Sequence, residues 1–175
     1  MSSKLIVIGG LPGTGKTSLA TDLARTLDAV HVRIDTIEQA LRTSTICGDA
    51  VGVAGYVVAY GIVEDNLRIQ RIVVVDCVNP LASTRVGWRG VARRAAVAIV
   101  EVELICSDLS EHRRRVESRI SETAGMKLPT WDEVMAREYE PWAGEHLVID
   151  TAHRPVEAGV IKLHALLLAR ERALR

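Results

Sequence analysis

The sequence predicts an α/β fold, in which crossover helices connect the strands of a parallel β-sheet. Short β-branched runs alternate with segments whose apolar residues recur at helical spacing, a pattern typical of such sheets. A glycine-rich turn, GGLPGTGKTS at residues 9–18, directly follows the first apolar run. A chain of 175 residues can bury a sizeable core without disulfides or metals, and we expect a single domain over residues 1–175.

Five strands are expected at the apolar runs of residues 4–8, 30–34, 71–75, 98–106 and 147–149. Helical patterns fill most of the intervals between them, at residues 17–27, 36–70, 85–95, 110–120 and 156–174. The second of these patterns is interrupted around residues 43–48. In the first helix, Leu19, Leu23 and Leu27 fall on one face, which is the face expected to contact the sheet.

The segment between the fourth and fifth strands is too polar to belong to the core. It contains an arginine-rich helix and the sequence Thr130-Trp131-Asp132-Glu133, which fits a capping box at the start of another short helix. That helix should end near residue 140, because Pro141 follows. We expect residues 110–142 to form a lid over a site.

The turn at residues 9–18 matches the Walker A pattern GxxxxGK[ST] in its required context of strand, loop and helix. Glycines let backbone N–H groups turn inward around an anion, and the helix that follows adds its positive dipole end. The lysine reaches the β- and γ-phosphates, and the threonine hydroxyl can bind Mg²⁺. The predicted ATP-binding residues are Gly10, Pro12, Gly13, Thr14, Gly15, Lys16, Thr17 and Ser18.

Three predicted strands end at an aspartate: Asp35, Asp76 and Asp150. In a parallel sheet these strand ends share one edge with the phosphate loop, where ligands bind. Asp76 follows a fully apolar run, the usual setting of a carboxylate that binds Mg²⁺, so Asp76 and Thr17 are the predicted metal ligands. We interpret Asp150 as a strand end without a chemical role.

Asp35 has two interpretations. It can cap the following helix, with Glu38 at the N3 position. It can also be a general base that accepts the proton of a substrate hydroxyl. The two roles are compatible.

These residues together resemble the small P-loop kinases of the nucleoside-monophosphate-kinase-like fold. Within that fold the chain is similar to the predicted AAA-type ATP-binding kinases near chloramphenicol phosphotransferase, adenylyl-sulfate kinase, gluconate kinase and polynucleotide 5′-hydroxyl kinase. The likeness covers nearly the whole chain. It depends on the segments GGLPGTGKTS, HVRIDTIEQALR, VVVDCVNP, EHRRRVESR and PTWDEVMAREYEPW, of which only the first is specific by itself.

The resemblance implies a three-layer fold with the strand order 2-3-1-4-5, a helical lid between strands four and five, ATP as donor, and Mg²⁺. It also implies that Asp35 acts as the base toward the acceptor, with residues 36–70 as the acceptor-side helical segment. Several relatives have an arginine three residues after this aspartate, where this chain has Glu38, and Arg33 or Arg42 could replace it. The acceptor's identity is therefore left open.

Four arginines crowd the first lid helix: Arg113, Arg114, Arg115 and Arg119. They could be solvated and paired with Glu111 and Glu117 at helical spacing. They could also close on the transferring phosphoryl group, which needs positive charge around it. Given their place after the fourth strand, we predict that Arg115 and Arg119, together with Lys16 and Asp35, are catalytic. Weaker candidates for acceptor contact are Tyr56, Tyr60, Arg85, Trp88 and Arg89.

The sequence thus predicts an ATP-dependent phosphotransferase that moves the γ-phosphate to a hydroxyl of a small molecule. Alternatives are a polynucleotide 5′-hydroxyl kinase, or a P-loop ATPase switch that acts with a protein partner. Lys plus Arg and Asp plus Glu number 22 each, which argues against binding to a nucleic-acid backbone or an anionic membrane. Three scattered cysteines predict reduced thiols and a cytoplasmic location. The oligomeric state is left open.

Overall fold

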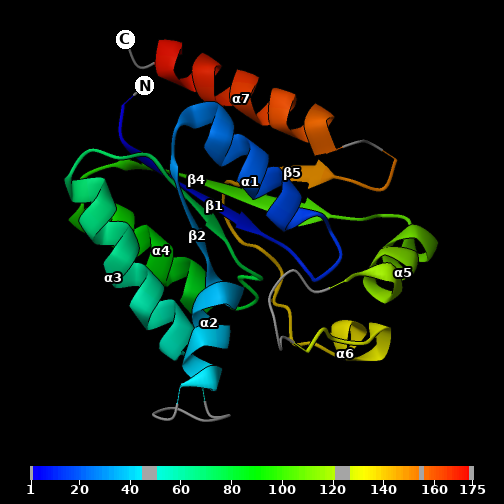
Figure 1. The fold of residues 1–175 in the computed structure, drawn as a ribbon. Helices are drawn as coiled ribbons and strands as arrows, with labels where there is room; N and C mark the ends of the chain where they lie inside the picture. Colours follow the sequence, from blue (N-terminus) through cyan, green and yellow to red (C-terminus); the bar gives the residue numbers. More distant parts are fainter. Residues whose placement is uncertain (1, 45–50, 121–126, 154–155, 174–175) are drawn as a thin grey trace.

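Five parallel strands form one sheet with the order β2-β3-β1-β4-β5 (Figure 1). The structure is a computed structural model that describes residues 2–44, 51–120, 127–153 and 156–173. The predicted fold class and strand order are confirmed. The strands are β1 (Lys4–Gly9), β2 (Val30–Arg33), β3 (Val73–Asp76), β4 (Ala98–Ile105) and β5 (Leu147–Asp150).

The register of the sheet brings the carboxyl ends of the central strands together. Ile8 of β1 lies opposite Asp76 of β3, and Asp76 lies opposite Arg33 of β2. Beyond the strand, the Gly10 N–H donates to the carbonyl of Val78 at 3.1 Å. The start of the glycine-rich turn is therefore fixed to the loop that follows Asp76, at the edge where parallel sheets bind ligands.

Helices cover both faces of the sheet (Figure 1). On one face lie α1 (Lys16–Leu27) and α7 (Val156–Ala173), and on the other α3 (Ala54–Arg68) and α4 (Ala82–Arg94). A hydrophobic core lies on each face of the sheet, and successive residues of β1 belong to opposite cores. Ile6 packs with α1 and α7, whereas Val7 packs with α3 and α4. Because both faces are buried, β1 is a continuous apolar run instead of an alternating one.

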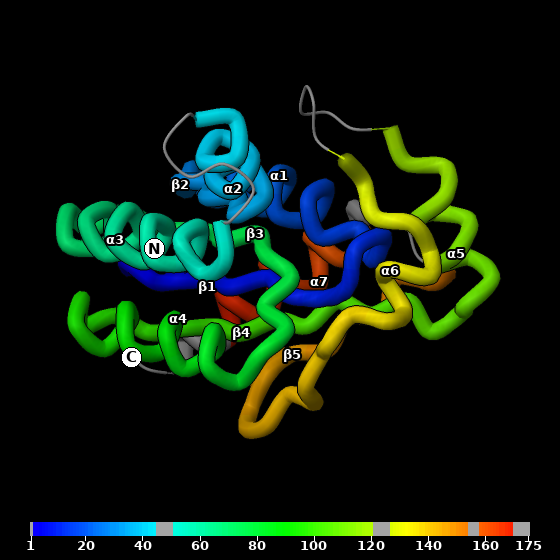
Figure 2. Tube along the Cα trace, turned by 90° about the horizontal axis from the view of Figure 1, so that it is seen from below, coloured from blue at the N-terminus to red at the C-terminus, as the bar shows by residue number. Residues whose placement is uncertain are grey.

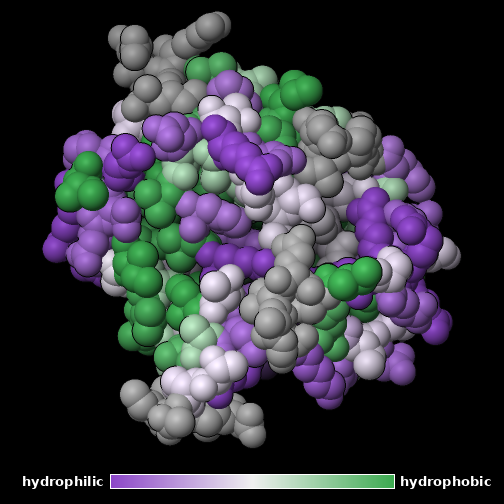
Figure 3. Space-filling view, in the orientation of Figure 1, coloured by the Kyte–Doolittle hydropathy of each residue, from purple (hydrophilic) through white to green (hydrophobic). Residues whose placement is uncertain are grey.

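The predicted helical segment 36–70 consists of two helices, α2 (Ile34–Thr43) and α3, and residues 45–50 between them lie outside the described part. The apolar run in this segment is typical of a buried helix, yet one side of α3 faces solvent. Val53, Val57 and Ile62 are exposed, and Figure 3 shows hydrophobic side chains gathered over α3. The first helix of the pair also begins earlier than predicted, at Ile34, with Arg33 at its N-cap position.

The polar segment after β4 contains α5 (Leu109–Ser118) and α6 (Trp131–Met135), which lie beside the loop between β1 and α1 (Figure 2). The capping box at Thr130 and Glu133 is confirmed. The predicted end of this helix near residue 140 is wrong, since its C-cap is Ala136. Residues 121–126 of the predicted lid lie outside the described part.

The residues after α6 are held against the body of the protein instead of continuing the helix. Both terminal nitrogens of the Arg85 guanidinium donate to the Glu140 carbonyl at 3.1 Å, and this guanidinium lies 5.1 Å from the Trp142 ring centroid. The Trp142 indole N–H donates to the Tyr139 hydroxyl, which donates to Glu103 on β4. These contacts favour an extended path across β4 over a longer helix.

No helix in the described ranges is long and apolar enough to cross a bilayer. Cys77 and Cys106 are buried free thiols, and Cys47 lies outside the described residues. Burial raises the pKa of both thiols. These two thiols are accordingly held in the neutral form, which is the less reactive one.

Candidate active site

The glycine-rich turn between β1 and α1 needs its glycines for two reasons. Gly10, Gly13 and Gly15 have φ values of 138°, 87° and 88°, a region that favours glycine. A Cβ at Gly10 would lie 2.2 Å from the Leu104 carbonyl oxygen, and one at Gly13 would lie 2.6 Å from the Val116 side chain. At the N-cap position Gly15 has no side chain to accept from the first N–H groups of α1, so these N–H groups are available to an anion.

Lys16, the first residue of α1, is buried at the centre of this turn. Its ammonium Nζ donates to the Leu11 carbonyl at 2.9 Å, within the same loop. Burial lowers the pKa of Lys16, while the nearby carboxylates of Asp76 and Asp35 raise it. The lysine is thus hydrogen-bonded within the phosphate loop and lies near the carboxylates of Asp76 and Asp35.

Asp76 ends β3 with a buried carboxylate. Its Oδ2 atom has no hydrogen-bond partner among the residues that the structure describes, and it lies 3.8 Å from Nε of Arg33. Buried carboxylate oxygens almost always have a partner, so this orphaned atom beside Lys16 fits a divalent cation. Thr17 directly follows Lys16 in the chain, and its hydroxyl and the Asp76 carboxylate are oxygen ligands of the kind that Mg²⁺ prefers.

Asp35 is the second residue of α2, and the helix cap is Arg33, so the interpretation of Asp35 as the N-cap is wrong. The positive end of the helix dipole still stabilises the negative charge of Asp35 in the first turn. The Asp35 carboxylate is about one-third exposed, and its Oδ2 lies 3.9 Å from the Arg33 guanidinium. It borders a cavity together with Lys16 and Thr17.

Two neighbouring cavities meet at the phosphate loop. The first, of about 380 Å³, is bordered by the loop and α5 and is lined by five cationic side chains and no carboxylate: Lys16, Arg33, Arg114, Arg115 and Arg119. The second, of about 500 Å³, is lined by Asp35 and other residues of α2. They are named the donor cavity and the acceptor cavity, after the roles proposed for them below. Lys16, Thr17 and Arg119 border both cavities. A group bound at this junction could pass from one cavity to the other.

The two predicted lid arginines lie in different surroundings. Arg115, on α5, donates to Glu111 at 2.7 Å, to the Thr151 hydroxyl at 3.0 Å and to the Thr151 carbonyl at 2.8 Å. Arg119 follows α5, and within the described part of the chain it has no hydrogen bond or ion pair with a carboxylate. Arg115 therefore joins α5 to the loop after β5, and the guanidinium of Arg119 is available to the junction of the cavities.

His112 is a site residue that the sequence analysis missed. Its ring is buried, and Nε2 donates to the Pro12 carbonyl of the phosphate loop at 2.8 Å. The Trp131 ring of α6 lies edge-on to the imidazole, with centroids 5.2 Å apart. His112 thus fastens α5 and α6 to the phosphate loop. One hundred residues separate the bonded pair, so no local pattern could have indicated it.

The weaker candidates for acceptor contact are structural residues. The Tyr60 hydroxyl donates to the Thr84 carbonyl, and the Tyr56 hydroxyl accepts from the Asn79 N–H. Trp88 is fully buried in the core, and Arg89 pairs with Glu101 of β4 at 2.7 Å. Together with Arg85, these side chains pack α3, α4 and the segment after α6. None of them borders the acceptor cavity, which is lined mainly by the phosphate loop, α2 and the residues that flank α6.

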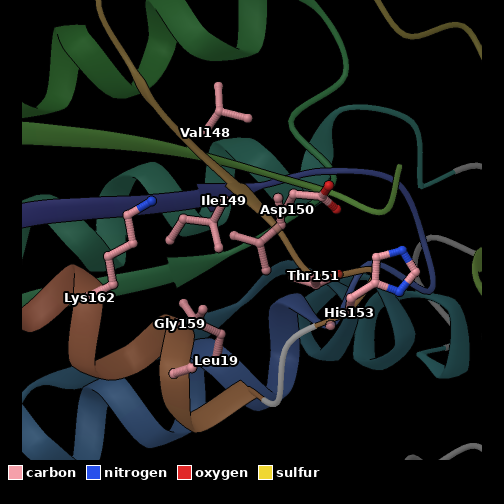
Figure 4. Close-up of a pocket in the computed structure, with 11 residues that line it drawn as sticks. Leu19, Val148, Ile149, Asp150, Thr151, His153, Gly159 and Lys162 are labelled. Carbon is pink, nitrogen blue, oxygen red and sulfur yellow. The ribbon is translucent and has the colours of Figure 1, made fainter. Parts of the chain in front are cut away.

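Asp150, at the end of β5, has a structural role. Its carboxylate accepts from the N–H and the hydroxyl of Ser107 and from the Ala152 N–H, and these bonds lower the pKa of Asp150. A cavity of about 430 Å³ lies between β5 and the helices α1 and α7, next to Gly15. Figure 4 shows Ile149 and Thr151 on one side of it and Leu19 and Gly159 on the other.

The sequence profile of a family described as an AAA domain matches residues 5–141. The chain belongs to this AAA domain family. Its match contains the phosphate loop, Asp35 and Asp76, and α5 and α6. No curated protein matches the chain.

Solved structures share the fold of this AAA domain chain. The APS kinase CysC of Mycobacterium tuberculosis, in complex with AMPPNP and APS, superposes with a TM-score of 0.68 at 19% identity, over 95% of this chain and 98% of that chain. A gluconokinase from Sinorhizobium meliloti gives 0.62 at 21%, over 95% and 97%. Kti12 of Chaetomium thermophilum, in complex with ADP-AlF3, gives 0.64 at 20%, over 92% and 97%. These likenesses show a P-loop kinase fold.

Proposed function

We propose that the protein is an ATP-dependent phosphotransferase that moves the γ-phosphate to a hydroxyl of a small molecule. One observation carries this proposal: the Asp35 carboxylate borders the same cavity as Lys16 and Thr17 of the phosphate loop. A hydroxyl bound at Asp35 would therefore lie next to the terminal phosphate of a nucleotide held by the loop. A site that only hydrolysed ATP would need no separate cavity of about 500 Å³ beside the phosphates.

The donor half of the reaction is assigned to the phosphate loop and to Arg119. Loop N–H groups and Lys16 would bind the β- and γ-phosphates, and Arg119 would neutralise charge on the transferring group. Thr17 and Asp76 would hold Mg²⁺, which when bound supplies positive charge to the phosphate oxygens. The cavity beside Gly15 would receive the nucleoside.

The acceptor half of the reaction is assigned to Asp35. Its carboxylate would orient the acceptor hydroxyl and accept its proton while the oxygen attacks the γ-phosphorus. A new phosphorus–oxygen bond forms, the bond to the β-phosphate oxygen breaks, and ADP leaves. Of the similar structures, the APS kinase was solved with AMPPNP and APS together, and the gluconokinase is also a kinase by name. Both support a nucleotide and a small molecule as the two substrates.

ATP turnover with and without hydroxyl compounds tests this proposal. We expect slow hydrolysis of MgATP by the protein alone, because water is a poor substitute for a positioned acceptor. A panel of sugars, sugar acids, nucleosides and aminoglycoside-like alcohols should contain members that accelerate ADP release and gain 80 Da by mass spectrometry, about the mass of one phosphoryl group. Steady hydrolysis that no hydroxyl compound changes, and that an added protein stimulates, would contradict it and favour an ATPase switch.

A further inference from the structure

We infer that the acceptor is an anionic alcohol, whose carboxylate or phosphate is bound by Lys127 and Arg137 while its hydroxyl lies at Asp35. This inference rests on the proposed function and adds the chemical class of the substrate. Lys127 lies shortly before α6 and Arg137 shortly after it, so one short helix carries both cations to the acceptor cavity.

The acceptor cavity has an excess of positive charge that the chain as a whole does not have. Charged residues are balanced over the sequence, 22 of each sign. The cavity has two carboxylates, on Asp35 and Glu38, and five cationic side chains: Lys16, Arg42, Arg119, Lys127 and Arg137. Such an excess in a concave site attracts an anionic ligand.

Three of these five cations have another assignment. Lys16 and Arg119 also border the donor cavity, where they would neutralise the charge of a nucleoside triphosphate. Arg42 is 3.1 Å from the Glu38 carboxylate, its neighbour one turn earlier on α2. Lys127 and Arg137 are left, and neither borders the donor cavity.

Lys127 and Arg137 have no hydrogen-bonded or ion-paired side chain among the residues that the structure describes. Most arginines there have a carboxylate within 4.0 Å, including Arg113, Arg114 and Arg115 of the neighbouring α5. The nearby carboxylate of Glu133 accepts from the Thr130 N–H at 2.8 Å as part of the capping box. Glu133 lies near enough to interact electrostatically with both cations, and Glu38 with Arg137, but neither carboxylate forms an ion pair with them. An anionic alcohol would supply the direct ion pair that a neutral one cannot.

The position of the two cations is set by a well-anchored helix. Val134 of α6 is fully buried, Trp131 packs on His112, and the capping box fixes the first turn. The Arg137 N–H continues the last turn by donating to the Val134 carbonyl at 3.4 Å. The two cations are therefore carried at a defined place opposite α2, which suits recognition of a small anion.

Binding of matched compounds to the protein saturated with Mg–AMPPNP tests the inference, because the nucleotide then fills the phosphate loop. The probes are glycerate, 3-phosphoglycerate and gluconate, with glycerol and sorbitol as neutral counterparts. Calorimetry should show that at least one anion binds about tenfold or more tightly than its neutral counterpart. In the double variant K127Q/R137Q the difference should disappear. R93Q, which removes an exposed arginine of α4 outside the cavity, should preserve it.

The outcomes separate the inference from the proposed function. A preference that survives in K127Q/R137Q, or no binding of any anionic probe up to about 10 mM, would overturn the inference while leaving the kinase proposal intact. If Mg–AMPPNP itself does not bind, the proposed function fails. In that case the same probes are titrated into the nucleotide-free wild-type protein, K127Q/R137Q and R93Q. Anion binding that is lost only in K127Q/R137Q would show that Lys127 and Arg137 form an anion site. The melting temperature of each variant should equal that of the wild-type protein, because the replaced side chains are exposed.

Discussion

At the scale of single residues, two aspartates near the phosphate loop have surroundings that suit different roles: Asp76 at the end of β3 and Asp35 in the first turn of α2. Asp76 is buried, and one of its oxygens is without a hydrogen bond in the described part of the chain. Asp35 is about one-third exposed and borders the acceptor cavity. A buried, unsatisfied carboxylate oxygen is suited to a cation. A carboxylate that substrate can reach, close to the phosphate loop, is suited to proton transfer.

The substitution Asp35→Asn tests the second role. It keeps the shape of the side chain and removes its ability to accept a proton. We expect the rate of phosphoryl transfer to fall about 10²-fold or more, while the affinity for MgATP stays within about twofold. Steady-state kinetics and a nucleotide titration measure the two quantities. Asp65→Asn, an exposed aspartate on α3, is the matched control. Transfer at the wild-type rate would reduce Asp35 to a structural residue.

At the scale of secondary structure elements, α5 is docked on the phosphate loop instead of standing apart as a free lid. His112 donates a hydrogen bond to the Pro12 carbonyl, and Val116 fills the space beside Gly13. Arg115 joins the helix to Thr151. Glycine at residue 13 is needed because a side chain there would collide with α5. The conformation of the loop and the position of the helix therefore depend on each other.

The substitution His112→Ala tests this coupling. It removes a buried ring, its contact with Trp131 and the bond to the loop, and it should lower the free energy of unfolding by about 2–4 kcal/mol. It should also weaken MgATP binding several-fold, since Pro12 is then unsupported. Chemical denaturation and calorimetry give the two values. Arg113→Ala, an exposed change on the same helix, should affect neither quantity by much. Full nucleotide affinity in a destabilised His112→Ala protein would refute the coupling.

The elements themselves differ in how far the sequence predicts them. The strand, loop and helix around residues 4–27 follow from local patterns, and the proximity of Asp76 to the phosphate loop follows from the rule that parallel strand ends share an edge. The start of α2 was misplaced because Ile34 fits a strand or a helix equally well. The end of α6 was misplaced because the Arg85 and Trp142 contacts that hold the following segment are tertiary.

At the scale of the whole molecule, the site is produced by the meeting of distant segments. Lys16 comes from the start of α1, Asp35 from α2, Arg119 from the end of α5 and Arg137 from beyond α6. The sequence supplies the residue types of the donor side, because the Walker A pattern is contiguous. On the acceptor side it indicates Asp35 and the segment after it, but not Lys127 and Arg137, which only the fold brings to the cavity. A neutral chain thereby concentrates positive charge at one edge of its sheet.

The central claim is that backbone N–H groups and Lys16 form an anion site for a nucleotide at the start of α1. Calorimetric titration with MgATP, for the wild-type protein and for Lys16→Ala, tests it most directly. We expect one nucleotide per chain to bind the wild-type protein, with affinity reduced at least about tenfold in the variant, as expected for loss of a buried cation–phosphate contact. No heat with the wild-type protein, or equal binding by the two proteins, would contradict the claim.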